Sequence, residues 1–107
     1  MSTPPDRVPL NALRVFEAVA AHLSFTAAAK ELGVTTAAVS AQIKALEADI
    51  GVPLFRRHTR AVALTQEGAE LLPGVRRGLE ELRRSVERIG REAVAGMLNL
   101  SVPNEFL

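Results

Sequence analysis

The sequence contains no cysteine, tryptophan or tyrosine, and only two histidines, His22 and His58, among its 107 residues. The absence of cysteine excludes a disulfide framework, a zinc finger and a cysteine nucleophile. Two histidines are too few for a metal site without strong carboxylate help. No apolar run approaches the roughly 20 residues that span a bilayer, and residues 1–10 lack an apolar signal region. We therefore expect no metal, no cofactor, no membrane association and a cytoplasmic location.

Catalytic groupings are absent too, because no nucleophile–base pair, phosphate-binding glycine loop or metal-ligand cluster can be found. We therefore predict no catalytic residues and no enzymatic activity. The net charge is only +1, but it is unevenly distributed. Residues 1–64 carry seven basic and five acidic residues, hence +2, and three of the basic residues cluster at Arg56, Arg57 and Arg60. Phosphate binding requires such a local patch rather than a high overall charge.

Two short amphipathic helix patterns joined by a glycine-containing turn occupy residues 24–47. The first covers Ser24–Leu32, the turn is Gly33–Thr35, and the second helix begins at Thr36. This arrangement predicts a helix-turn-helix, the unit that lays its second helix in the DNA major groove. Before it, apolar residues recur at every third or fourth position from Leu10 to about His22, which predicts a further helix with Asn11 as its cap.

The phase of the second helix separates an inner from an outer face. At about 100° per residue, Val39, Ile43, Leu46 and Ile50 form one stripe that we expect to pack inward. The outer face carries small or polar side chains that can approach base edges, with a lysine suited to phosphate and a glutamine at its flank: Thr36, Ala37, Ser40, Ala41, Lys44 and Gln42. Any exposed helix shows Ser, Thr and Lys, so the pattern alone leaves DNA contact and plain solvent exposure equally open.

Residues 54–64 have the pattern of a short hairpin with a basic tip. Leu54–Arg57 and Ala61–Leu64 flank His58-Thr59-Arg60, which predicts a wing. Arginines there can neutralise phosphates or enter a narrow minor groove, although they could also be a solvated turn. The predicted DNA-binding set is completed by two threonines of the helix-turn-helix and four wing residues: Thr26, Thr35, Arg56, Arg57, His58 and Arg60.

A long helix is predicted from Gln66 to Ala95, capped by Thr65. Six apolar residues with 3-4-3-4-3 spacing form a heptad seam: Leu72, Val75, Leu79, Leu82, Val86 and Ile89. Such a helix is too long for a small head to cover, so the seam predicts a homodimer; the alternative is a core helix of the same domain. Pro73 should kink or break the helix. Residues 97–102 alternate apolar and polar side chains and predict a strand that lacks a partner.

Together these segments resemble the N-terminal domain of LysR-type transcriptional regulators. The resemblance is carried by Pro9–Glu17, Leu23–Ala29, Val34–Glu47, Pro53–Arg57 and Leu64–Gly68. The start of the matching region, Pro9–Leu13, is similar to the subgroup of the glycine-cleavage activator and the β-lactamase regulator.

The resemblance implies a mainly α fold: a winged helix-turn-helix over residues 1–64, a dimerising linker helix over 65–96, and the start of a truncated C-terminal domain at 97–107. That domain would be of the periplasmic-binding-protein type and would bind a small-molecule effector. The implied partner is double-stranded DNA with a pseudo-palindromic operator, bound by a homodimer that can form higher oligomers in the full-length protein. Thr36, Ala37 and Ser40 would then read the major groove, and Arg57 matches the wing arginine that enters the minor groove.

The chain departs from the family pattern at two places on the second helix. Thr36-Ala37 stands where the family often has Gln-Pro or Gln-Ala, and Ala41 stands where it often has Arg or His. These differences predict a different operator half-site. The alternative function is a winged-helix protein-interaction module with a coiled-coil rod, which the Ser/Thr/Lys face and the basic wing disfavour.

Overall fold

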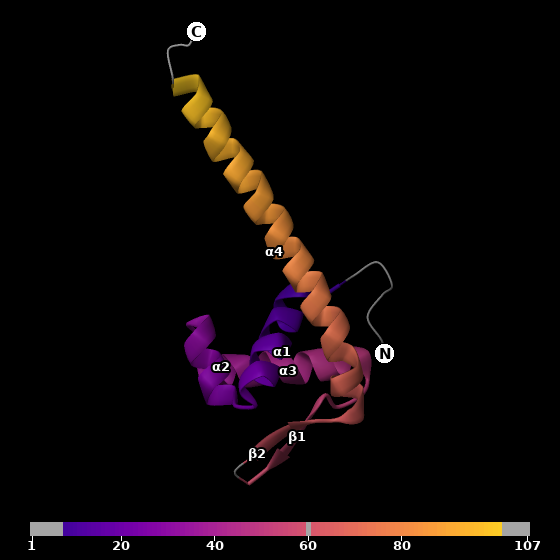
Figure 1. Ribbon diagram of the computed structural model, residues 1–107. Coiled ribbons are helices and arrows are strands. Elements are labelled where there is room, and N and C mark those ends of the chain that lie inside the picture. Colours follow the sequence, from indigo (N-terminus) through magenta and orange to yellow (C-terminus); the bar gives the residue numbers. More distant parts are fainter. Residues whose placement is uncertain (1–7, 60, 102–107) are drawn as a thin grey trace. The chain divides into compact units, whose positions relative to one another are not determined.

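The computed structural model describes residues 8–59 and 61–101 (Figure 1). These residues form four helices and one two-stranded hairpin: α1 (Leu10–His22), α2 (Phe25–Leu32), α3 (Thr36–Ile50), β1 (Phe55–His58), β2 (Ala61–Leu64) and α4 (Gln66–Ser101). The predicted mainly α winged helix-turn-helix with a long C-terminal helix is therefore confirmed. The chain divides into two compact units between Arg76 and Arg77, within α4, and each is described separately.

Local capping explains where the helices of the helix-turn-helix begin and end. The hydroxyl of Ser24 accepts a hydrogen bond from the Ala27 amide at 3.0 Å, and Thr35 does the same for Ala38 at 3.0 Å. Such caps satisfy amide groups that have no partner within the first helical turn. Gly33 ends α2 at a φ of 70°, a left-handed conformation that glycine adopts without a Cβ penalty. The predicted turn at Gly33–Thr35 is thus confirmed.

The predicted cap of α1 is wrong by two residues. Pro9 occupies the N-cap position, and its carbonyl accepts from the Leu13 amide at 3.0 Å. Asn11 lies inside the first turn, where its Oδ1 accepts from Arg14 Nη2 at 3.2 Å. The helix starts earlier because the Pro9 carbonyl already accepts the first helical hydrogen bond.

The core of the head, residues 8–76, lies where α1, α2 and α3 pack against one another. Phe16, Val19, Val39 and Ile43 are fully buried, and Leu46 is nearly so. Three of the four residues predicted to face inward on α3 are therefore buried. Ile50 is the exception at 39% exposure; it is the last residue of α3, directly before the left-handed Gly51.

The wing is an antiparallel hairpin in which Phe55 pairs with Leu64, and His58 pairs with Ala61. The predicted hairpin is confirmed; Arg60 lies outside the described residues. Glu47 on α3 holds the start of the wing, because its Oε2 accepts from the Leu54 amide at 2.7 Å and from the Phe55 amide at 3.2 Å.

Replacing Glu47 by alanine is expected to destabilise the head by roughly 1–3 kcal/mol, because two partly buried amides lose a charged acceptor. Urea unfolding measures the loss. Glu92→Ala on an exposed stretch of α4 is the matched control and should change stability by less than about 0.5 kcal/mol. Equal losses for the two variants would show that the Glu47 contacts contribute nothing.

Thr65 joins the wing to α4. Its hydroxyl donates to the Pro53 carbonyl at 2.8 Å and accepts from the Gly68 amide at 3.0 Å, which confirms the predicted cap. The backbone of Gly68 lies so close to that of Leu54 that a Cβ on Gly68 would lie 2.2 Å from the Leu54 carbonyl oxygen. Only glycine therefore fits at position 68 with the wing in this position.

α4 is longer and more continuous than predicted. It continues through Pro73 without a break and includes residues 97–101, so the strand predicted there is wrong; Val102 lies outside the described residues. A single strand would leave its backbone groups unpaired, whereas a helix pairs them within the segment.

The predicted seam divides into two parts with different surroundings. Leu72 and Val75 are each only 7% exposed in the single chain, so this part of the seam belongs to the core of the head, as the alternative interpretation had it. Along the second unit, Leu82, Val86 and Ile89 are 49%, 73% and 61% exposed. These three residues remain available to a partner.

Candidate nucleic-acid interface

The outer face of α3 presents four short side chains and one lysine to solvent. Thr36, Ala37, Ala41 and Lys44 are exposed, and Ser40 is half-buried. Thr35 precedes them as the N-cap, so its hydroxyl oxygen already accepts a backbone hydrogen bond. The structure therefore gathers the predicted major-groove residues on one accessible face.

Gln42 lies apart from that face. It is half-buried and lines a small hollow of about 80 Å³ with Asn11, Arg14 and Val34. This hollow lies between α1 and the turn of the helix-turn-helix. The flanking position predicted for Gln42 thus places its side chain beside α1 rather than among the base-reading candidates.

The wing presents its side chains on two faces, because successive residues of a strand point to opposite sides. Phe55 is buried and its ring centroid lies 5.4 Å from that of Phe16. Arg57 lies on the same face as Phe55, whereas Arg56 and His58 lie on the opposite face. The arginines of the wing are therefore not equivalent.

Arg57 contacts both helices of the helix-turn-helix. Its Cζ lies 4.3 Å from the centroid of the Phe25 ring, and its Nη1 donates to Ser40 Oγ at 3.4 Å. The Phe25 ring in turn meets Phe55 edge-on, with centroids 6.0 Å apart. This stack connects the core of the head to a cation on its surface.

A second hollow brings the start of α2 and the wing together. It has a volume of about 290 Å³, and its lining includes Ser24, Thr26, His58 and Thr59. Thr26 and His58, which were predicted separately, thus lie on one concave surface. A threonine hydroxyl and a histidine side chain can both donate hydrogen bonds to an anionic oxygen.

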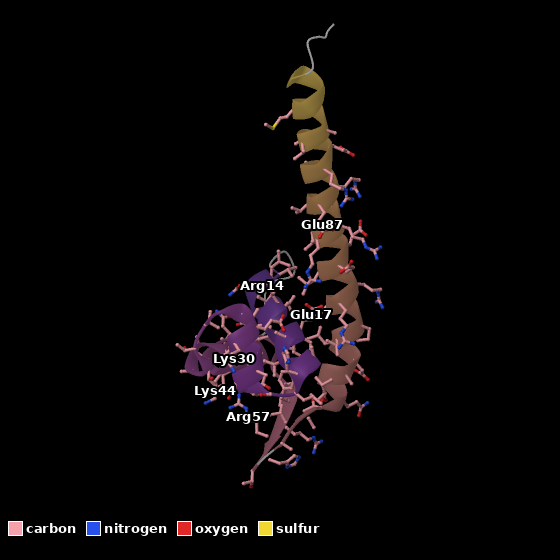
Figure 2. All side chains as sticks on the ribbon, turned by 60° about the vertical axis from the view of Figure 1, so that its left-hand side comes forward. Arg14, Glu17, Lys30, Lys44, Arg57 and Glu87 are labelled. Carbon is pink, nitrogen blue, oxygen red and sulfur yellow. The ribbon has the colours of Figure 1, made fainter. Side chains whose placement is uncertain are left out.

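One cation was overlooked in the sequence. Figure 2 shows Lys30 of α2 on the same side of the head, in that view, as Lys44 and Arg57. Lys30 is exposed in the last turn of α2. Its position relative to the other cations depends on how α2 and α3 pack, and an isolated lysine in the sequence carries no such signal.

Other kinds of site find no support within the described ranges. No group of three or more histidine, aspartate or glutamate side chains there could hold a metal ion. Across residues 8–59 and 61–101, no helix has the length and apolar composition needed to traverse a bilayer.

The fold and the exposed face of α3 define a regulatory winged helix-turn-helix. Residues 10–69 match the model of the bacterial regulatory helix-turn-helix proteins of the lysR family. The chain belongs to this family, whose members are transcription regulators and not enzymes.

Individual relatives agree with this assignment. The chain is 46% identical to the glycine cleavage system transcriptional activator of Escherichia coli K12 over 98 residues, which are 92% of this chain and 32% of the relative. It is also 46% identical to the HTH-type transcriptional activator AmpR of Providencia stuartii over 100 residues, 94% of this chain and 34% of that protein. The chain thus spans about a third of the length of these relatives.

A solved structure shares the fold. The crystal structure of the BenM_DBD/catB site 1 DNA complex has a TM-score of 0.75 and 34% identity to this chain, and the match covers 80% of this chain and 97% of that one.

Proposed function

We propose that this chain binds double-stranded DNA as the N-terminal domain of a cytoplasmic LysR-type transcriptional regulator. The observation that carries the proposal is the exposed face of α3 with its short side chains, which the cationic wing contacts through the Arg57–Ser40 hydrogen bond. Small side chains let the helix backbone approach base edges closely, and Lys44 and Arg56 flank them as exposed cations for phosphates. The similarity to a protein solved as a DNA complex supports the same function.

We further propose that the domain acts as a homodimer on a pseudo-palindromic operator. The exposed apolar residues Leu82, Val86 and Ile89 on α4 support this, because an apolar stripe at heptad spacing is buried when two such helices pair. A two-fold symmetric dimer reads two half-sites of related sequence. Formation of higher oligomers and binding of a small-molecule effector would depend on an additional C-terminal domain. The relatives are long enough to contain such a domain.

Selection of binding sites from random DNA tests the proposal directly. The homodimer is expected to enrich two inverted half-sites at a fixed spacing. Enrichment of no sequence, together with no measurable DNA affinity at low salt, would contradict DNA binding and favour the protein-interaction module.

DNA affinity is expected to fall steeply with salt, because cations of the wing and α3 release counterions from phosphates. The logarithm of the binding constant should fall by about 0.9 per phosphate neutralised for each unit of log salt concentration. Replacing Lys44 and Arg56 by glutamine should flatten this slope by about that amount for each contact removed. Fluorescence anisotropy over a range of salt concentrations measures it.

The matched control is the double variant Arg84→Gln, Arg88→Gln on α4, which changes the net charge equally and should leave the slope unchanged. A wild-type affinity that does not vary with salt would contradict phosphate binding by these residues.

A further inference from the structure

Arg57 has a different environment from the other wing cations. It lies two residues after Phe55 on β1 and therefore shares the face that packs on the helices. Arg56 and His58 lie on the opposite face of β1, and all three side chains are exposed. What distinguishes Arg57 is its contact with the recognition helix, a 3.4 Å hydrogen bond to Ser40.

The Phe25 ring acts as a platform for the Arg57 guanidinium. A cation placed over an aromatic face within about 6 Å of the centroid is attracted by the ring quadrupole, and the separation here is 4.3 Å. The Phe25 ring thereby covers one side of the guanidinium, while N–H donors on the other sides stay available. Because a guanidinium has five such donors in a fixed plane, the bond to Ser40 leaves the others free for an acceptor on a ligand.

The first part of the recognition helix lacks a side chain of this kind. Over residues 36–41 its outer face offers Thr36, Ala37, Ser40 and Ala41, whose side chains are all short, and the lysine of this face, Lys44, lies one turn further along. Bidentate recognition of a guanine, through its O6 and N7, is the commonest specific contact in the major groove and requires arginine or lysine. The fold places an arginine beside Ser40, and it comes from the wing.

We propose that Arg57, Phe25 and Ser40 form one reading unit in the major groove, in which the wing supplies the long donor that residues 36–41 of α3 lack. Arg57 contacts a guanine next to the base pair that Ser40 faces, and Phe25 holds its guanidinium in the required plane. The inference rests on the proposed DNA-binding function. It gives Arg57 a role different from insertion into the minor groove, since a side chain in contact with Ser40 lies on the α3 side of the phosphate backbone.

The test compares Arg57→Lys with Arg56→Lys, the same substitution at adjacent residues on opposite faces of β1. Binding sites are selected for the wild type, and affinities are then measured for the selected site and for each single-base variant. We expect one required G·C pair per half-site in the wild type. Arg57→Lys should reduce discrimination at that pair about tenfold, because a lysine ammonium is a point charge and lacks the rigid planar fork of donors that an arginine held against Phe25 presents to O6 and N7.

Arg56→Lys should leave the whole pattern of base preferences unchanged. Phe25→Leu, which keeps an apolar side chain but removes the ring, should reduce discrimination at the same G·C pair as Arg57→Lys and nowhere else. The combined Phe25→Leu, Arg57→Lys variant should show no further loss there. Thermal unfolding verifies that Phe25→Leu folds, and the Arg57→Lys result stands independently of it.

Several results would overturn the reading unit. Equal effects of Arg57→Lys and Arg56→Lys on every sequence would make Arg57 a phosphate contact. A loss confined to A·T preferences in the flanks would assign it to the minor groove. In both cases the wild type still binds DNA and the proposed function survives, whereas a wild type without DNA affinity would overturn both proposals.

Discussion

Replacing Val86 and Ile89 by aspartate is expected to prevent the proposed homodimer from forming and to leave a monomer. Both side chains are largely exposed in the single chain, at 73% and 61%, and burying an apolar side chain of this size contributes roughly 1.5–3 kcal/mol. In a dimer, Val86 and Ile89 of both protomers would be buried, four such side chains in all. The variant instead forces four carboxylates into the seam, which is strongly unfavourable without partners. Sedimentation equilibrium should therefore show the monomer mass at concentrations where the wild type is dimeric.

DNA binding should fail together with dimerisation. Two linked heads engage the second half-site at a high effective concentration, and loss of that linkage lowers the affinity by about 10²–10⁴-fold. The head itself should unfold as in the wild type, because both substitutions lie in the second unit.

The control for this variant is Arg84→Ala, Arg88→Ala, which makes the same change in net charge at outer positions of the heptad. It should remain dimeric. A dimer that withstands the aspartates, or that dissociates equally in the control, would contradict the seam at Val86 and Ile89.

Gly68→Ala is expected to destabilise the head by roughly 1–3 kcal/mol, the usual effect of overpacking. The added methyl would lie 2.2 Å from the Leu54 carbonyl oxygen and 2.9 Å from Leu64 Cδ2. The Leu54 carbonyl cannot move freely, because it accepts from the Thr65 amide at 3.0 Å. Relief of the clash therefore separates the wing from α4 and weakens DNA binding as well. Urea unfolding and anisotropy measure the two effects.

The same substitution at Gly78 should have the opposite sign. Apart from its chain neighbours and the nearby backbone of α4, no atom lies within 4 Å of a Cβ built there, so only the better helix propensity of alanine remains, up to about 1 kcal/mol. If Gly68→Ala stabilised the protein as much as Gly78→Ala, the wing would be able to move away from α4 at no cost in free energy.

The helix-turn-helix was predictable because its boundaries depend on neighbours in the sequence. Ser24 and Thr35 each cap an amide three residues ahead, and Gly33 ends α2 by its own backbone conformation. The inward residues Val39, Ile43 and Leu46 follow from helical periodicity alone. The DNA-contact roles predicted for residues of this face stay predictions, as does the minor-groove role of Arg57.

The errors arose where periodicity meets the end of an element. Residues 97–102 alternate like a strand, yet residues 97–101 continue α4, because within the described residues the only sheet is the β1–β2 hairpin and it does not include them. The heptad spacing from Leu72 to Ile89 is uniform, but it does not indicate where a helix leaves its own core. The packing of the head decided that Leu72 and Val75 are buried within the chain.

The sequence by itself determined the helix-turn-helix, the wing, their order, the turn glycine and the family, because capping, periodicity and backbone preference act over a few residues. Only the tertiary structure decided which arginine of the wing contacts the recognition helix, and that Gly68 must be a glycine. Arg57 and Ser40 are 17 residues apart, and Gly68 meets the backbone of Leu54. Contacts of this kind depend on how the wing, α2, α3 and the start of α4 pack together, and no local pattern of residues encodes that packing.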